Sequence, residues 1–269
     1  YKSGSTIIRV NSNVQVGDAL TGDPTVAETI QSGPGNDTIT GSANDVLDLA
    51  NTIGTSGPAT VTANLTVTLP EGNTNGTAVT GNLLGTDTLV GMQNVNTGAG
   101  ADSITGSSAA NRIDAGDGSD VVDGGAGADT VLAGAGADRV VFDAADSIDG
   151  GTGVDSLVIK TSTLDLRTVT TPQVSNLEVL DIAQDTGANE VILTKAFVDA
   201  MGATTTPVTI EGGANDKLRL ANDASNPLTP IWYRDPSADV AASGSTPAYV
   251  AYKSGSTIIR VNSNVQVGD

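Results

Sequence analysis

The chain has 269 residues, 3% aromatic residues, no Cys and no His, and a formal net charge of −19 from 31 acidic and 12 basic side chains. This charge disfavours nucleic acid and anionic membranes as partners, because like charges repel one another within a Debye length. Without Cys or His there is no disulfide, no Ser-His-Asp or Cys-His hydrolysis and no ordinary zinc protease site.

The first eighteen residues, YKSGSTIIRVNSNVQVGD, recur unchanged as residues 252–269. Such identity indicates tandem duplication with a period of 251 residues (252 − 1). We expect residues 252–269 to dock on their own domain. Residues 1–18 are then the tail strands of a preceding identical module, either frayed or paired with another chain. The expected partners are identical neighbouring modules, and lateral and end-to-end self-assembly both remain open.

Residues 19–49 are predicted to form one short coil. Two nine-residue lines, SGPGNDTIT and GSANDVLDL, place Asp37 and Asp45 two residues before an apolar side chain. Each acid ends a turn and each apolar residue lies in the middle of the short strand that follows, which makes this coil a candidate calcium site.

Residues 50–96 read as a β-strand insertion. Within it, ATVTANLTVTL at 59–69 alternates apolar and polar residues, which predicts one half-buried strand. An outward row of Thr invites a glycan- or ice-binding interpretation. The solvent face of an ordinary sheet is the more frequent origin of such a row.

Residues 97–159 repeat a nine-residue pattern. The lines are TGAGADSIT, GSSAANRID, AGDGSDVVD, GGAGADTVL, AGAGADRVV, the shortened FDAADSID and GGTGVDSLV. An apolar residue that we expect to face the interior follows two positions after the residue that closes each turn. The closing residues are Asp102, Asn111, Asp120, Asp129, Asp138, Asp146 and Asp155.

Glycine in these lines allows backbone angles closed to other residues, so the first six residues form a turn whose carbonyls converge. The last three residues form a short strand, and two lines make one coil of eighteen residues. Asp102, Asp120, Asp138 and Asp155 should stack on one edge, and Asn111, Asp129 and Asp146 on the other. The turn glycines of the predicted sites are Gly98, Gly100, Gly116, Gly118, Gly125, Gly127, Gly134 and Gly136.

Carboxylates stacked about 4.8 Å apart repel unless a cation lies between them. Hard oxygen ligands select Ca²⁺ over softer metals. At ligand concentrations about a hundred times the dissociation constant, each site contributes about 2.7 kcal/mol. Several Ca²⁺ ions would therefore stabilise the fold. Asn111 and the shortened line with Asp146 depart from the pattern, which weakens the prediction at those two lines.

The lines match G-G-x-G-x-D-x-U-x, and the segment resembles the RTX (repeats-in-toxin) family. The resemblance implies a calcium-filled parallel β-roll, export by type I secretion and folding in external calcium. It therefore implies an extracellular or bacterial cell-surface location. No eighteen-residue apolar run or signal-peptide pattern is found, so direct membrane insertion is not expected.

Residues 160–269 are predicted to be a β-rich domain that caps the roll and contains one short helix. TKAFVDAMG, 194–202, has Thr as N-cap and Gly as C-terminal stop. PVTIEGGANDKLRL, 207–220, reads as a hairpin-like pair of strands, and its GGANDKL turn lacks a stacked partner for a metal. The Trp and Tyr residues near 232 and 249 favour a core over a sugar-binding platform.

The expected fold is therefore all-β: a parallel roll of RTX repeats with a C-terminal β-rich capping domain. The function we expect is a calcium-rigidified structural tandem module of a bacterial surface protein, such as an adhesin stalk, matrix or cell-surface filament, and not an enzyme. An S-layer lattice protein and a glycan- or ice-binding module remain the alternatives.

Overall fold

The computed structural model describes residues 6–9, 19–23, 25–31, 35–54, 57–60, 64–71, 75–80, 85–169, 173–183, 188–202, 206–221, 232–243 and 248–268. The chain divides into two compact units, Tyr1–Gly153 and Val154–Asp269. Within the described residues, no helix is long and apolar enough to span a membrane.

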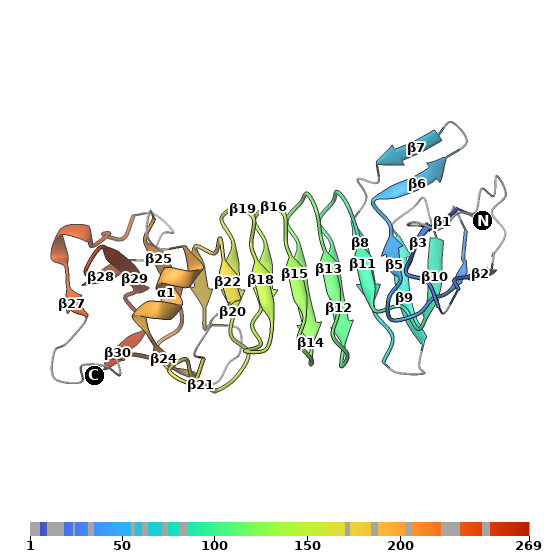
Figure 1. Ribbon diagram of the computed structural model, residues 1–269. Helices are drawn as coiled ribbons and strands as arrows, with labels where there is room; N and C mark the ends of the chain where they lie inside the picture. Colours follow the sequence, from blue (N-terminus) through green and yellow to red (C-terminus); the bar gives the residue numbers. More distant parts are fainter. Residues whose placement is uncertain are drawn as a thin grey trace. The chain divides into compact units, whose positions relative to one another are not determined.

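The first unit is a two-sheet roll whose strands are stacked like rungs (Figure 1). The strands that this unit contributes to one sheet, which we call the first sheet, all pair in parallel. Its strands in spatial order are β1 (Thr6–Arg9), β3 (Glu28–Gln31), β5 (Val46–Asp48), β11 (Asn94–Asn96), β13 (Arg112–Asp114), β15 (Thr130–Leu132) and β18 (Ser147–Asp149).

The facing sheet, which we call the second sheet, is parallel except at β9. Its strands in order are β2 (Ala19–Thr21), β4 (Thr38–Thr40), β10 (Gly85–Val90), β9 (Asn75–Thr80), β8 (Leu65–Thr68), β12 (Ser103–Ser107), β14 (Val121–Gly125) and β17 (Arg139–Val141). The remaining strands of the unit are the hairpin β6 (Asn51–Gly54) and β7 (Gly57–Thr60), and the short pair β16 (Ala135–Gly136) and β19 (Thr152–Gly153).

One apolar side chain per strand fills the space between the two sheets. In the first sheet these residues face one another in register, and none is more than 1% exposed: Ile30, Leu47, Val95, Ile113, Val131 and Ile148. The equivalent residues of the second sheet include Ile104, Val122 and Val140, which are equally buried. The inward positions read from the nine-residue pattern are confirmed.

The predicted single strand at 59–69 is wrong in its extent. Ala59 and Thr60 belong to the hairpin strand β7, while Leu65–Thr68 form β8 in the second sheet. Residues 61–63 lie outside the described residues. Strand β8 does alternate as expected, with Leu65 and Val67 buried and the two Thr exposed.

The second unit also stacks parallel strands in two sheets. One contains β20 (Ser156–Val158), β23 (Val179–Asp181), β25 (Val208–Glu211) and β29 (Thr257–Asn262), followed by the antiparallel β28 (Tyr249–Ser254) and then β27 (Tyr233–Arg234). The other contains β21 (Thr163–Asp165), β24 (Glu190–Leu193), β26 (Lys217–Leu220) and β30 (Gln266–Gly268). Strand β22 (Gln173–Ser175), helix α1 (Lys195–Met201) and the 3₁₀ turn η1 (Pro236–Ala238) complete it.

The predicted hairpin at 207–220 is wrong. Strands β25 and β26 pair with different sheets, each with a parallel neighbour, so residues 212–216 are a crossover between sheets. The Asp216 carboxylate holds this turn by accepting hydrogen bonds from the N–H groups of Gly213 and Asn189, at 2.6 and 3.0 Å. The GGANDKL turn therefore does have a stacked neighbour, the chain at Asn189.

The predicted helix is confirmed. Thr194 accepts a hydrogen bond from the N–H of Phe197, and Gly202 ends the helix in the left-handed conformation with φ of 112°. Trp232 is 8% exposed, while Tyr249 and Tyr252 are half-buried, which fits a core role for the aromatic residues.

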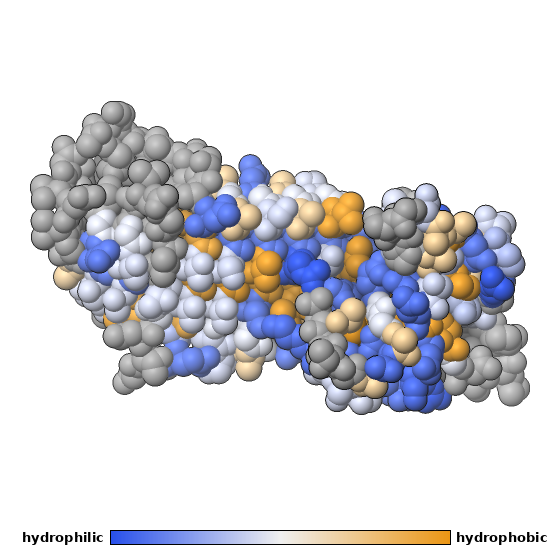
Figure 2. Space-filling model, turned by 180° about the vertical axis from the view of Figure 1, so that it is seen from behind, coloured by the Kyte–Doolittle hydropathy of each residue, from blue (hydrophilic) through white to orange (hydrophobic). Residues whose placement is uncertain are grey.

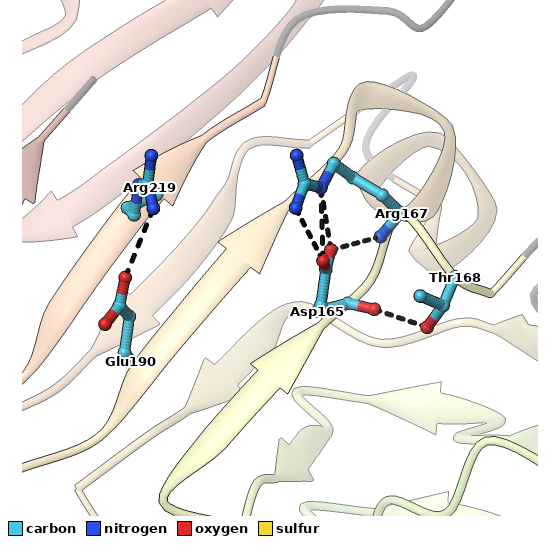
Figure 3. Close-up of polar contacts among 5 residues, drawn as sticks. All are labelled: Asp165, Arg167, Thr168, Glu190 and Arg219. Carbon is cyan, nitrogen blue, oxygen red and sulfur yellow. Dashed lines mark hydrogen bonds and ion pairs between the residues drawn. The ribbon is translucent and has the colours of Figure 1, made fainter.

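Cationic side chains neutralise several acids of the second unit (Figure 3). The carboxylate of Asp165 accepts hydrogen bonds from the Arg167 guanidinium, with Nη2 at 2.7 Å. Arg219 on β26 lies 3.5 Å from Glu190 on the neighbouring strand β24. By contrast, residues 19–111 contain no Lys or Arg. In the first unit Arg112 lies 3.5 Å from Asp114, but the acids of residues 19–111 have no basic residue within their own stretch of chain.

Candidate calcium sites

The turns at one edge of the roll, residues 97–102, 115–120 and 133–138, stack directly on one another. The N–H of Asp117 donates to the carbonyl of Gly98 at 2.7 Å, and the N–H of Gly100 donates to the carbonyl of Asp117 at 2.8 Å. The same pair of bonds links the second turn to the third, through Ala135, Gly116 and Gly118. This ladder brings backbone and carboxylate oxygens of successive turns together.

Glycine is required in these turns for two separate reasons. Gly116 and Gly118 have φ of 96° and 149°, which side-chain-bearing residues rarely adopt. A Cβ on either residue would also lie 1.8 Å from a carbonyl oxygen of the turn before it. All eight predicted turn glycines have positive φ: Gly98, Gly100, Gly116, Gly118, Gly125, Gly127, Gly134 and Gly136.

The Asp residues of this edge form a continuous stack. One carboxylate oxygen of Asp120 accepts the N–H of Asp102 at 2.8 Å, and one of Asp138 accepts the N–H of Asp120 at 2.8 Å. The second oxygens of Asp102 and Asp120 are buried without a hydrogen-bond partner. A buried carboxylate oxygen left unsatisfied is costly, and a bound cation would remove that cost.

The opposite edge repeats the arrangement at its C-terminal end. Asp129 accepts the N–H of Asn111 at 2.8 Å, and Asp146 accepts the N–H of Asp129 at 2.9 Å. The second carboxylate oxygen of Asp129 is also buried without a partner. Asp155, the last of the predicted acids, belongs to the second unit, where its N–H donates to Glu178 at 2.9 Å.

Burial shifts the ionisation of these acids. It raises the pKa of Asp120 to about 7, against the hydrogen bond from the Asp102 N–H and with repulsion from neighbouring Asp side chains. Burial likewise raises the pKa of Asp146 to about 6. The pKa values of Asp102, Asp129 and Asp138 are raised for the same reason. A divalent cation would favour the charged form at each position.

An amide network satisfies the side chain of Asn111. Its Nδ2 donates to the backbone oxygen of Gln93 at 2.8 Å and to the Gln93 side-chain oxygen at 3.0 Å, while its Oδ1 accepts the N–H of Ser107 at 2.7 Å. The turn also carries Ser107 and Ala109 where other turns have Gly, and neither has positive φ. The side chain of Asn111 is therefore hydrogen-bonded within the protein and, unlike Asp120, leaves no vacant oxygen for a cation.

Asp87 is a candidate ligand that the pattern search missed. It is 1% exposed and accepts the N–H of Asp37 at 2.9 Å, across fifty residues of sequence. Asp37 itself is 3% exposed. The signal was present, because Gly85-Thr86-Asp87-Thr88-Leu89 has the spacing of the second half of a nine-residue line. Asp87 was missed because it lies within residues 50–96, which the sequence analysis interprets as a β-strand insertion.

Asp45 differs from the acids of the main roll. Its two carboxylate oxygens accept the N–H groups of Glu28 and Ser42, at 2.9 and 2.6 Å. Asp216 of the second unit is satisfied in the same way. Neither acid therefore has the vacant oxygen found at Asp102, Asp120 and Asp129, and the case for metal binding is weaker there.

Comparison with known families agrees with this geometry. The family model for the RTX calcium-binding nonapeptide repeat matches four times, at residues 26–50, 84–122, 96–131 and 105–140. The roll is an RTX repeat module. No curated protein matches the chain.

RTX repeats bind calcium ions structurally, and the donors in this roll suit that ion. Calcium takes six to eight oxygen ligands from carboxylates, carbonyls and water. Each pair of stacked RTX turns offers two carboxylates and several carbonyls. Among the described residues, no three Asp or Glu side chains gather as a metal cluster. The carbonyls must therefore supply the majority of the ligands.

The RTX repeat is a structural calcium-binding repeat and not a catalytic fold, and such repeats are typical of secreted extracellular proteins. In this roll the acids lie at the turns between the sheets, where each one also accepts a backbone N–H from the neighbouring coil. A cation bound to these acids would connect successive coils of the roll.

Proposed function

We propose that this chain is a calcium-rigidified structural module, repeated in tandem, of an extracellular bacterial surface protein such as an adhesin stalk, matrix or filament. The observation that carries the proposal is the set of buried, unpartnered carboxylate oxygens at Asp102, Asp120 and Asp129. A bound cation would satisfy these oxygens, which otherwise lose their hydration without gaining a hydrogen bond.

Calcium binding is expected to stabilise the folded module. Extracellular calcium modules bind with dissociation constants of about 10⁻⁴–10⁻³ M. A site that calcium fills at about a hundred times its dissociation constant adds about 2.7 kcal/mol. Three or four such sites would add on the order of 10 kcal/mol, comparable with the whole stability of an ordinary domain. The protein would then fold where calcium is abundant, outside the cell.

Tandem repetition is supported by the eighteen-residue identity of residues 1–18 and 252–269. The C-terminal copy forms the second part of β28, all of β29 and all of β30. Of the N-terminal copy, the structure describes residues 6–9, which form β1 and pair with β3. The other residues of that copy lie outside the described residues.

A calcium titration tests the structural proposal. The chain is monitored by circular dichroism and small-angle scattering while Ca²⁺ is added to protein prepared in EDTA. We expect β structure and compactness to rise together with calcium, with Mg²⁺ at the same concentration as a control for ionic strength. A chain equally folded in EDTA and in calcium would refute it.

An S-layer lattice protein is the alternative within the same structural class. It would use the same calcium-dependent roll, but calcium would also connect neighbouring molecules. Electron microscopy after calcium addition separates the two, since a lattice protein forms sheets and a stalk module remains monomeric or forms linear assemblies.

A binding role for one sheet face is a second candidate, favoured by a row of threonines. In register across five adjacent strands of the second sheet lie Thr105, Thr68, Thr77, Thr88 and Thr38. Pale side chains of near-neutral hydropathy lie in rows over the N-terminal part of the face in Figure 2. An uncharged face suits a neutral partner such as a glycan or ice. Retention on a glycan array or in growing ice, lost in Thr68→Lys, would support this role.

A further inference from the structure

We infer that successive copies of this chain are joined without a flexible linker, so that the last coil of one copy packs against the first coil of the next. The inference rests on the tandem proposal above and adds the interface by which the copies meet. Its partner is a second copy of this chain.

The repeated segment belongs firmly to the module that precedes it. Strand β29 is parallel to β25, with Ile259 opposite Val208, and β30 is parallel to β26, with Val267 opposite Leu218. Ile259 and Val261 are at most 1% exposed. The segment is therefore the closing coil of its own module and is unavailable as a spacer.

The length of chain between the two modules is one residue. Strand β30 ends at Gly268, and in the next copy β2 begins at Ala19, which follows Asp18, the equivalent of Asp269. One residue spans at most about 3.6 Å. Two modules joined by one residue cannot move independently of each other, because their end coils are held within contact distance.

Both end coils present strand edges that accept a parallel partner. Strand β30 is the last strand of its sheet, and β3 accepts a parallel strand on the edge that β1 occupies here, with Ile8 opposite Ile30. In an array the residues of β1 are those of β29 in the preceding copy, which β25 and β28 already flank, so this edge of β3 is left for another strand. Exposed edges of this kind pair with further strands. In an array, the packing of copy on copy would cover these edges at every internal joint.

The charge distribution favours the same head-to-tail order. Residues 19–111 carry eight acids and no Lys or Arg, whereas residues 160–269 hold eight of the twelve basic residues. Three of these lie on strands of the last coils: Arg219 on β26, Lys253 on β28 and Arg260 on β29. Residues 160–269 also carry twelve acids, and Arg219 is paired with Glu190, so the net charge of this tail is −4 (8 − 12) against −8 for residues 19–111. A head-to-tail joint therefore carries less like-charge repulsion than a head-to-head one.

A two-copy protein tests the joint. Residues 1–269 are followed directly by a second copy of residues 19–269, with Ser263→Cys in the first copy and Ser103→Cys in the second. Both serines are exposed, and the native chain has no Cys, so these are the two spin-label sites. The distance distribution between the labels is measured by pulsed electron paramagnetic resonance in calcium.

The comparison variant carries twelve Gly/Ser residues between Asp269 and the following Ala19, a linker with a root-mean-square span of about 20 Å. The matched control carries the same twelve residues in the exposed loop between Ala241 and Ala242. We expect a single narrow peak for the direct fusion and for the loop control, and a distribution at least twice as wide for the joint variant.

A direct fusion as broad as the joint variant would overturn the inference. It would leave the proposed function intact provided that both proteins still fold in response to calcium. A chain that ignores calcium, or a natural gene with a single copy, would instead defeat the proposed function. The distance measurement would then still report whether two copies pack end to end.

Discussion

At the scale of single residues, the acids of the roll combine two opposing properties. One oxygen of Asp120 is satisfied by the backbone of the neighbouring coil, and the other is buried with no partner. The hydrogen bond fixes the position of the side chain, and the unpartnered oxygen is left to bind a cation. Such an acid stabilises the fold when a cation is present and destabilises it when the cation is absent.

Asp120→Asn should therefore act in opposite directions with and without calcium. In calcium we expect the free energy of unfolding to fall by about 2.7 kcal/mol, the contribution of one site at a hundred times its dissociation constant. In EDTA the neutral amide should be neutral or stabilising, because no charge is buried. Urea unfolding in both buffers measures the change. Asp114→Asn, on the outward-facing position of β13, removes only a partly exposed ion pair with Arg112 and should change either value by less than about 1 kcal/mol. Equal effects at both positions would contradict the assignment.

The pH dependence should also reverse with calcium. The folded pKa of Asp120 is raised from 3.8 to about 7, so between these values the calcium-free folded state binds more protons than the unfolded state. Its contribution to stability is fully present below pH 3.8 and is lost as the pH rises towards 7. In EDTA, the urea concentration at the midpoint of unfolding should therefore be higher at pH 5 than at pH 7. In calcium it should be lower at pH 5 than at pH 7, because protons compete with the ion. A change in the same direction in both buffers would exclude this linkage.

Asn111→Asp should make this line of the roll more dependent on calcium. The amide Nδ2 that contacts Gln93 is replaced by an oxygen, which brings a buried acceptor against two other acceptors. We expect a loss of about 1–3 kcal/mol in EDTA from the unsatisfied group. Calcium should recover part of this loss if the ion can enter the site. Asn111→Ala is the control, since it removes the same hydrogen bonds but supplies no ligand, and calcium should not rescue it.

At the scale of secondary-structure elements, stacking of turns explains the glycines. The turns approach so closely that Gly118 has room for no Cβ, and its φ of 149° is unsuited to other residues. Strand pairing on either side keeps the turns at this spacing, so they cannot separate to admit a side chain.

Gly118→Ala should destabilise the roll by about 2–4 kcal/mol through the steric clash and backbone strain together. Calcium should be needed at higher concentration to fold the variant, which circular dichroism would report. Gly213→Ala is the matched control, because its Cβ would lie 3.5 Å from the nearest atom and its φ is not positive. If the two variants had equal stability, close stacking of the turns would be wrong.

At the scale of the whole molecule, the two units neutralise their acids differently. The second unit pairs Asp165 with Arg167 and Glu190 with Arg219, and Lys195 and Arg234 also contact acids. The first unit has no basic residue between 19 and 111, and beyond that stretch Arg112 pairs with Asp114 at 3.5 Å. Exposed ion pairs contribute at most about 1 kcal/mol each, but they prevent the like-charge repulsion present in the carboxylate stacks.

Hydrogen exchange should show this division. In EDTA we expect the amides of β12–β18 to lose protection, while those of β24, α1 and β26 retain most of theirs. In calcium both sets should be protected. Arg219→Gln should lower the protection of β24 and β26 alone. Uniform loss of protection along the chain in EDTA would show that the units fold as one calcium-dependent body.

Much of the roll could be predicted from the sequence because the residues that determine each coil are close together in the chain. A nine-residue line contains its own turn glycines, its acidic residue and its inward apolar residue, so the turns, the short strands and buried positions such as Val122 and Val131 could be predicted from spacing. The resemblance to the RTX family added the calcium-filled parallel roll. The helix at 195–201 was equally local, with both of its capping residues adjacent to it in sequence.

The remaining features depended on which distant segments meet. Asp87 faces Asp37 across fifty residues, and Asn111 is satisfied by Gln93 of the preceding coil. Strands β25 and β26 are neighbours in sequence yet join different sheets. A hairpin and a crossover share the same pattern of strand, turn and strand. The choice between them depends on the strand edges that the preceding coils leave open, and those edges exist only in the folded molecule.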